Sequence, residues 1–229
     1  MNGTGDTDTT ILAIDTAGRA AQAGVFRGGR ALAAECLPMV RGQAEHLLPL
    51  VERVMAAAGT EFSALGLVAV TVGPGSFTGL RVGLAAARGF EIALGCPLAG
   101  VSSLSAWAMG TRPGLAADDR ILVLLDSRRG GDAFAQVFDG TAAPLSDAAA
   151  ASPAAALAEA LAALPPRARL GVAGDLAGLE MPGDPRLCDR RGEAPDLAAV
   201  AAAAPDARHR RAAEPLYLRA ADAVPARRG

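Results

Sequence analysis

The sequence predicts an α/β protein of two lobes, in which a β-β-β-α-β-α unit is duplicated and the second copy is degenerate. Two observations carry this prediction. A hydrophobic run that ends in an acid opens each half of the chain, at TILAIDTA (residues 10–17) and at ILVLLDSRRGG (residues 121–131). After each run, strand-like apolar segments alternate with helical periodicity, as expected for a sheet covered by helices. The chain therefore divides into a lobe of residues 1–110 and a smaller lobe of residues 111–229.

The first half is an ordered series of strands and helices. Residues 10–17 form a buried strand that ends at Asp15, and Gly28-Gly29 marks a hairpin turn, so the chain opens with a three-stranded meander. The elements expected after it are an amphipathic helix (43–59), a buried strand (65–73), a long helix (79–95), a strand (97–103) and a short helix (104–109).

The second half has a weaker pattern, because alanine fills both faces of its helices and obscures the period. Residues 111–119 have the composition of a linker. The elements expected after it are a strand, a turn and a second strand within residues 121–140, a helix (153–163), a strand (169–174), a helix (195–204) and a last short strand (214–219).

The composition excludes several kinds of function. All 22 basic residues are arginine, so no Schiff-base lysine, P-loop lysine or lysine general base is available. The net charge of −2 does not indicate nucleic-acid binding by the chain as a whole. Its three cysteines are far apart, which excludes a disulfide framework and a paired-cysteine metal site. The polar start MNGTGDTDTT is no secretory signal and no membrane-spanning run exists, so we expect a cytoplasmic protein.

The stretch VGPGSFTGLRVG (residues 72–83) looks like a phosphate-binding loop that runs into a helix. A Walker A loop is excluded because Leu80 and Arg81 replace its lysine and hydroxyl residue, and a GxGxxG loop is excluded by Thr78. A turn at a helix N-terminus could still hold an anion. The structural alternative is a tight turn with Ser76 or Thr78 as the helix cap. The candidate residues for a nucleotide or anion remnant are Asp15, Thr16, Gly73, Gly75 and Ser76.

The helix after this loop carries small residues on one face. Gly79, Gly83 and Ala87 are four residues apart, and an interior glycine costs about 1 kcal/mol of helix stability relative to alanine. The spacing therefore indicates close approach to another element, which could be the helix of residues 44–58 or a partner chain.

Metal and acyl-transfer chemistry are not expected. The two histidines, His46 and His209, lie in different halves, so neither an HxxxH pair nor an HExxH motif exists. The sequence also lacks the GxSxG elbow of a serine hydrolase.

Segments along nearly the whole chain resemble the TsaB family, also called YeaZ. They are ILAIDTA, HLLPLVERVMAAAG, VAVTVGPGSFTGLRVGLAAARGFEIALGCPLAGVSSL, LLDSRRGGDAFAQVFD and EPLYLR, in that order. GPGSFTGLRVG is highly specific to the family, and the closing EPLYLR supports it independently. The resemblance implies the actin, hexokinase and Hsp70-like ATPase fold, in which the strand-ending acids, here Asp15 and Asp126, face the phosphates across a cleft.

The resemblance further implies a non-catalytic subunit of a transferase complex. The complex forms threonylcarbamoyl-adenosine next to the anticodon of ANN-decoding tRNAs. The implied partners are the catalytic subunit TsaD, in a heterodimer, and the ATPase TsaE, with tRNA reached through the complex and no membrane contact. A homodimer through the same helices is also implied. No intrinsic cofactor is expected, although ATP or ADP could bind at the complex interface.

The family's pairing surface corresponds to the helices of residues 44–58 and 78–94. The interface residues predicted on them are Leu47, Leu50, Val51, Val54, Leu80, Gly83, Leu84 and Ala87. The alternative function is an active ATPase or small-molecule kinase of the same fold, which would bind and hydrolyse nucleotide in isolation and would lose this activity in Asp15→Ala.

Overall fold

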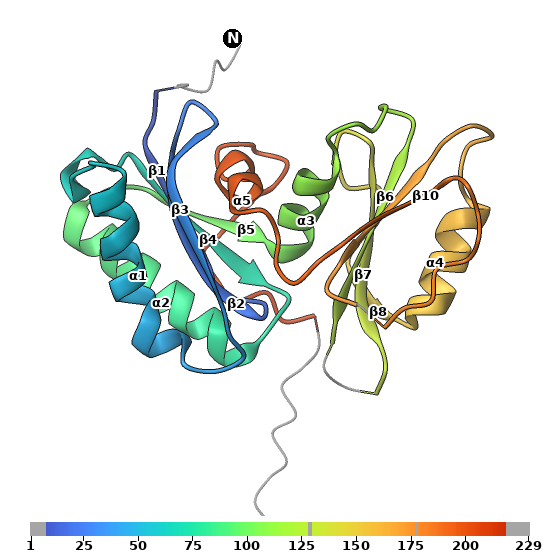
Figure 1. Ribbon diagram of the computed structural model, residues 1–229, viewed down its shortest axis with the longest axis horizontal. Helices are drawn as coiled ribbons and strands as arrows, with labels where there is room; N and C mark the ends of the chain where they lie inside the picture. Colours follow the sequence, from blue (N-terminus) through green and yellow to red (C-terminus); the bar gives the residue numbers. More distant parts are fainter. Residues whose placement is uncertain (1–7, 128–129, 177, 219–229) are drawn as a thin grey trace, which may run out of the picture.

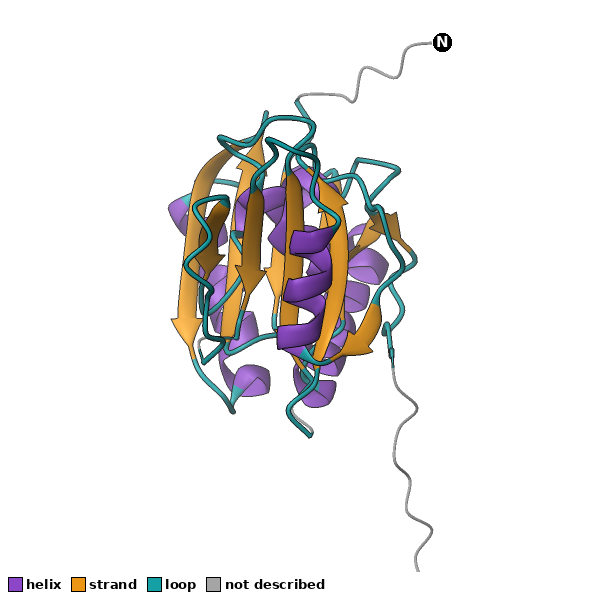
Figure 2. Ribbon diagram, turned by 90° about the vertical axis from the view of Figure 1, so that its right-hand side faces the viewer, coloured by secondary structure: helices purple, strands orange, loops and turns teal. Residues whose placement is uncertain are grey.

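Two β-sheets stand beside one another with helices outside and between them (Figure 1). The computed structural model describes residues 8–127, 130–176 and 178–218. Helices α1 and α2 cover the outer face of the first sheet, α3 and α5 lie between the sheets, and α4 covers the outer face of the second sheet (Figures 1 and 2). The predicted two-lobed α/β fold class is confirmed.

The first sheet contains the predicted meander and the two parallel strands that follow it. Its strand order is β11-β5-β4-β1-β2-β3, with β1, β4 and β5 parallel. The strands and helices of this part of the chain are, in order, β1 (Ile11–Asp15), β2 (Ala20–Arg27), β3 (Arg30–Pro38), α1 (Gln43–Ala57), the short 3-10 turn η1 (Phe62–Ala64), β4 (Leu67–Gly73), α2 (Phe77–Leu94), β5 (Leu98–Ser102) and α3 (Ser103–Thr111).

The second sheet has the order β10-β9-β6-β7-β8 and one helix on its outer face. Two of its strands, β8 and β10, have no counterpart in the sequence prediction. The elements are β6 (Arg120–Asp126), β7 (Ala133–Asp139), β8 (Ala149–Ala151), α4 (Pro153–Ala162), β9 (Leu170–Gly174) and β10 (Leu187–Arg191).

The last described part of the chain returns to the first sheet. Helix α5 (Leu197–Ala203) packs against β1, and strand β11 (Arg210–Arg211) pairs antiparallel with β5. The predicted strand at 214–219 is wrong over its described residues, which form no strand. Pro215 has no N–H to donate, and the Leu216 N–H donates to the Val72 carbonyl at 2.7 Å, with no ladder of bonds to a neighbouring strand among the described residues. The lobe boundary at residue 110 stays a prediction.

Both faces of the central strands β1, β2 and β4 are buried, which explains their continuous apolar sequences. Along β1, Leu12 and Ile14 pack toward α1 and α2, while Ala13 packs toward α3 and α5. The apolar stripe of each covering helix therefore points inward. Among the described helices, none has the length and apolar content required to cross a bilayer.

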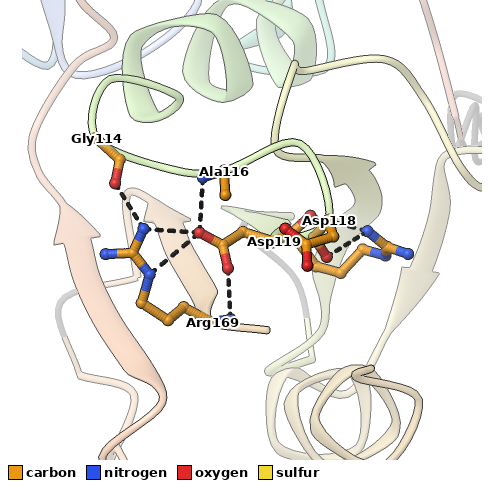
Figure 3. Close-up of polar contacts among 6 residues, drawn as sticks. Gly114, Ala116, Asp118, Asp119 and Arg169 are labelled. Atoms are coloured by element: carbon orange, nitrogen blue, oxygen red, sulfur yellow. Dashed lines mark hydrogen bonds and ion pairs between the residues drawn. The ribbon is translucent and has the colours of Figure 1, made fainter. Parts of the chain in front are cut away.

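An ion pair between the buried Asp119 carboxylate and the half-exposed Arg169 guanidinium ties the segment between the lobes to the second sheet. The Asp119 carboxylate accepts bonds from the backbone N–H groups of Ala116 and Arg169 and from the Arg169 guanidinium, which also donates to the Gly114 carbonyl (Figure 3). Burial alone would raise the pKa of Asp119, but these donors outweigh it and hold the pKa below its ordinary value.

Candidate functional site

Asp15 ends β1 at the carboxyl edge of the first sheet, as predicted, and its carboxylate is bonded to its own chain. The Ala17 N–H and the Thr71 hydroxyl donate to Oδ1, and the Gln22 amide donates to Oδ2 at 3.3 Å. The residue is 1 % exposed. Burial raises its pKa, although the bonds from Thr71, Ala17 and Gln22 act in the opposite direction. Neither Thr71 nor Gln22 is predicted from the sequence as a partner of Asp15.

The glycine turn before α2 brings the chain against the turn that follows β1. The Ser76 N–H donates to the Ala17 carbonyl at 2.8 Å, and Ser76 Oγ accepts the Gly79 N–H at 3.3 Å, so Ser76 is the predicted helix cap. Gly73 has a φ of 105°, which favours glycine. A Cβ on Gly75 would overlap the Ala17 carbonyl oxygen.

Carbonyl oxygens of this chain therefore approach the turn where an anion would have to bind. Thr16 Oγ1 donates to the Gly79 carbonyl at 2.7 Å and is itself buried. These contacts favour the structural interpretation of the glycines. The anion role assigned to Asp15, Thr16, Gly73, Gly75 and Ser76 stays a prediction.

The small-residue face of α2 packs against the first sheet. A Cβ on Gly79 would overlap the Thr16 carbonyl oxygen, and a Cβ on Gly83 would lie 2.5 Å from Thr16 Oγ1 and 3.5 Å from Val70. The expectation that this face meets the helix of residues 44–58 or a partner chain is thus wrong for both glycines. Their close approach is to β1 and β4.

The eight predicted interface residues are buried within this chain, which corrects that assignment. An amphipathic helix turns its apolar stripe toward the core, and here the core is the first sheet. A side chain that is 5 % exposed or less cannot contact a partner chain unless its helix moves. The residues concerned are Leu47, Leu50, Val51, Val54, Leu80, Leu84 and Ala87, with Gly83 also buried.

The outer face of α1 and α2 instead presents apolar side chains that are not among the predicted interface residues. Leu48 on α1 is 51 % exposed, and on α2 Phe77 is 45 % and Ile92 83 % exposed. The Arg81 guanidinium lies 3.8 Å from the Phe77 ring centroid, and the Tyr217 ring lies 5.6 Å from Phe77. Aromatic and arginine side chains of this kind are typical of protein interfaces. The prediction that these two helices form a pairing surface thus has candidate contacts.

The space between the lobes is nearly closed. It measures about 20 Å³ and is lined by Asp15, Asp126, Asp175, Glu193 and Trp107, among others. Asp175 Oδ1 accepts the Asp126 N–H at 2.7 Å, which holds the second strand-ending acid in place. Small-molecule sites occupy roughly 300–1,000 Å³, so the space that these described residues enclose is much smaller than such a site. Arg128, two residues after Asp126 in the stretch ILVLLDSRRGG, lies outside the described residues.

Neither histidine lines this space. His46 is exposed on α1, whereas His209 is 1 % exposed, and neither of its ring nitrogens has a hydrogen-bond partner among the residues that the structure describes. Burial lowers the pKa of His209. In residues 8–127, 130–176 and 178–218, no group of three or more His, Cys, Asp or Glu side chains is arranged to hold a metal ion.

Comparison with known proteins gives a consistent set of relatives. The family model for TsaD, tRNA N6-adenosine threonylcarbamoyltransferase, matches residues 39–180. The tRNA threonylcarbamoyladenosine biosynthesis protein TsaB of Escherichia coli strain K12 is 36 % identical over 121 residues, which cover 52 % of this chain and 51 % of that protein. TsaB of Haemophilus influenzae is 30 % identical over 129 residues, covering 56 % and 53 %. The chain thus spans about half the length of these curated relatives.

Solved structures match over more of the chain. YeaZ from Pseudomonas aeruginosa has a TM-score of 0.74 at 26 % identity, covering 92 % of this chain and all of that one. A second P. aeruginosa structure, described as similar to peptidase YEAZ, has a TM-score of 0.75 at 28 % identity with the same coverage. Both contain the two-lobed arrangement found here.

Proposed function

This chain belongs to the family that the TsaD model describes, and within it to the TsaB (YeaZ) proteins, and from its place in that family we propose a function for it. It is a non-catalytic subunit of a complex that modifies tRNA. The modification is the formation of threonylcarbamoyl-adenosine next to the anticodon of ANN-decoding tRNAs. The chain pairs with the catalytic subunit TsaD and supports its activity in the cytoplasm.

The observation that carries the non-catalytic role is the state of Asp15. A strand-ending acid that served a metal–phosphate group would need free oxygens in an open cleft. Both Asp15 oxygens accept bonds from the chain, and the adjoining space measures only about 20 Å³. Such a site supports a structural carboxylate better than a catalytic one.

The outer face of α1 and α2 supports the pairing role. Leu48 and Ile92 are exposed apolar side chains on two helices that pack on each other, and Phe77 begins the second of them. Two helices of this kind from each of two chains can form a four-helix bundle. We propose TsaD as the partner on this face, with self-pairing through the same face when TsaD is absent. TsaE joins the paired subunits, tRNA is reached through the complex, and any ATP or ADP binds at the interface between subunits.

Sedimentation velocity tests the pairing. The purified chain, TsaD and an equimolar mixture are compared at micromolar concentration. We expect a species with the mass of the heterodimer and loss of any homodimer boundary. Independent sedimentation of the two proteins at every concentration would contradict the proposal.

The second candidate function, an active ATPase or small-molecule kinase, keeps one supporting observation, the position of Asp15 at the end of β1. It predicts phosphate release by the isolated chain that disappears in Asp15→Ala. Nucleotide hydrolysis at the level of the buffer control, for both proteins, would leave only the subunit role.

A further inference from the structure

A cavity of about 460 Å³ lies at the edge of the first sheet opposite Asp15. Ile11 and Leu67, the first residues of the parallel strands β1 and β4, line it, whereas Asp15 and Gly73 are the last residues of the same strands. The cavity is therefore separate from the cleft between the lobes and lies at the amino-terminal edge of the sheet.

The walls of the cavity are mainly apolar, and the space is open because the helix on one side carries small alanine side chains. Phe26 of β2 lies on the sheet side together with Ile11 and Leu67, and Ala198 and Ala201 come from α5. This helix has the sequence LAAVAAA, so its methyl side chains pack against the sheet without filling the space beside it. The volume falls within the range of small-molecule sites, which is roughly 300–1,000 Å³.

Two arginines supply the charge of the cavity. Arg27, the last residue of β2, donates from Nε to Thr10 Oγ1 at 2.9 Å, which fixes the guanidinium and leaves its two terminal nitrogens for a ligand. Arg210 enters from β11. None of the described residues that line the cavity is acidic, and within this part of the chain neither guanidinium forms an ion pair.

We infer that this cavity is a binding site for a small amphipathic carboxylate, an acid head group on an apolar body of about ten carbon atoms. A guanidinium fork matches the two oxygens of a carboxylate, and the resulting charge-assisted bonds are among the stronger ones in proteins. The apolar body lies between the sheet and α5. Helices α1 and α2 cover the other face of the sheet, so the site stays open when that face is paired, and the inference does not depend on the proposed function.

Isothermal titration calorimetry with decanoate, below its micelle concentration, tests the site in the full chain. We expect saturable binding with one site per chain and binding at least about tenfold weaker for decan-1-ol, which has the same body without the charge. Arg27→Gln and Arg210→Gln should each weaken decanoate binding about tenfold. Arg30→Gln is the matched control, because Arg30 is exposed on the same hairpin but does not line the cavity.

Ala202→Phe tests the cavity independently of charge. Ala202 lines the cavity from the exposed side of α5, so a phenyl ring there occupies the space without entering the core. We expect loss of decanoate binding with an unchanged thermal unfolding midpoint. The inference is overturned if decanoate does not saturate, if decan-1-ol binds equally well, or if Arg27→Gln, Arg210→Gln and Ala202→Phe all bind like the Arg30→Gln control.

Discussion

The hydroxyl of Thr16 donates to the carbonyl of Gly79 at 2.7 Å, while the Thr16 carbonyl oxygen lies where a Cβ on Gly79 would be. Residues 63 positions apart are therefore in contact through both backbone and side chain. The contact joins the turn after β1 to the first turn of α2. It fixes the helix whose outer face we propose as a pairing surface.

Gly79→Ala should destabilise the chain by about 2–3 kcal/mol, because the added methyl group overlaps backbone that has no room to move. Gly89→Ala on the same helix is the control: nothing lies within 4 Å of its Cβ position, so it should stabilise the chain by about 0.5–1 kcal/mol. Urea unfolding measures both. Equal effects of the two substitutions would mean that the Thr16–Gly79 contact is absent in solution.

Leu48→Glu and Ile92→Glu should abolish pairing with TsaD and leave the chain folded, because both side chains are exposed. Leu145→Glu, at a position 52 % exposed in the second lobe, should pair normally. Sedimentation velocity and circular dichroism report pairing and folding. Normal pairing by Leu48→Glu and Ile92→Glu together would exclude this face.

Leu50→Arg should behave differently from the exposed variants. Leu50 is fully buried between α1 and the sheet, so the substitution places an unpaired charge in the core at a cost of several kcal/mol. We expect little soluble folded protein. A folded Leu50→Arg chain that fails only to pair would restore Leu50 to the interface.

Asp119→Asn should cost about 1–3 kcal/mol at pH 7, because it weakens the bonds to Arg169 and Ala116. The folded-state pKa of Asp119 lies below its unfolded value, so its contribution is present above pH 4 and is lost as the pH falls through the folded pKa. The stability difference from wild type should therefore shrink below about pH 4. Asp118→Asn, at the exposed neighbouring carboxylate, should show no comparable loss in urea unfolding at either pH.

Asp15 should show the opposite pH dependence. Its folded-state pKa is raised, so the carboxyl contributes stability that is present below the unfolded pKa, near 4, and is lost as the pH rises through the folded pKa. Urea unfolding of wild type and Asp15→Asn at pH 4, 5.5 and 7 measures this. The wild type should lose stability relative to Asp15→Asn as the pH rises, and a gain would contradict the burial of this carboxyl.

Periodicity predicted the first lobe well, because its strands are continuous apolar runs and its helices have clear stripes. The strand that ends at Asp15 and the helix that begins at Gln43 are examples. It failed at β11, where Arg210-Arg211 has no strand-like apolar pattern and pairs only because the chain returns to β5.

The apolar stripe of a helix also does not show whether the chain's own sheet or a partner chain covers it. Leu47 and Leu50 pack on this chain's own sheet, while Leu48, which falls off the stripe, faces outward. The position of Leu48 off the apolar stripe is the feature of the sequence from which the exposed apolar face could have been predicted. The Asp15 partners Thr71 and Gln22 come from neighbouring strands, and only the register of the sheet brings them together.

Reconstitution of the modification tests the central claim most directly. The other enzymes of the modification, TsaD and TsaE among them, are combined with ATP, bicarbonate, threonine and unmodified tRNA, with and without this chain, and the modified nucleoside is quantified by mass spectrometry. We predict product only when the chain is present, and equally with Asp15→Asn. Equal product without the chain would contradict its role as a required subunit.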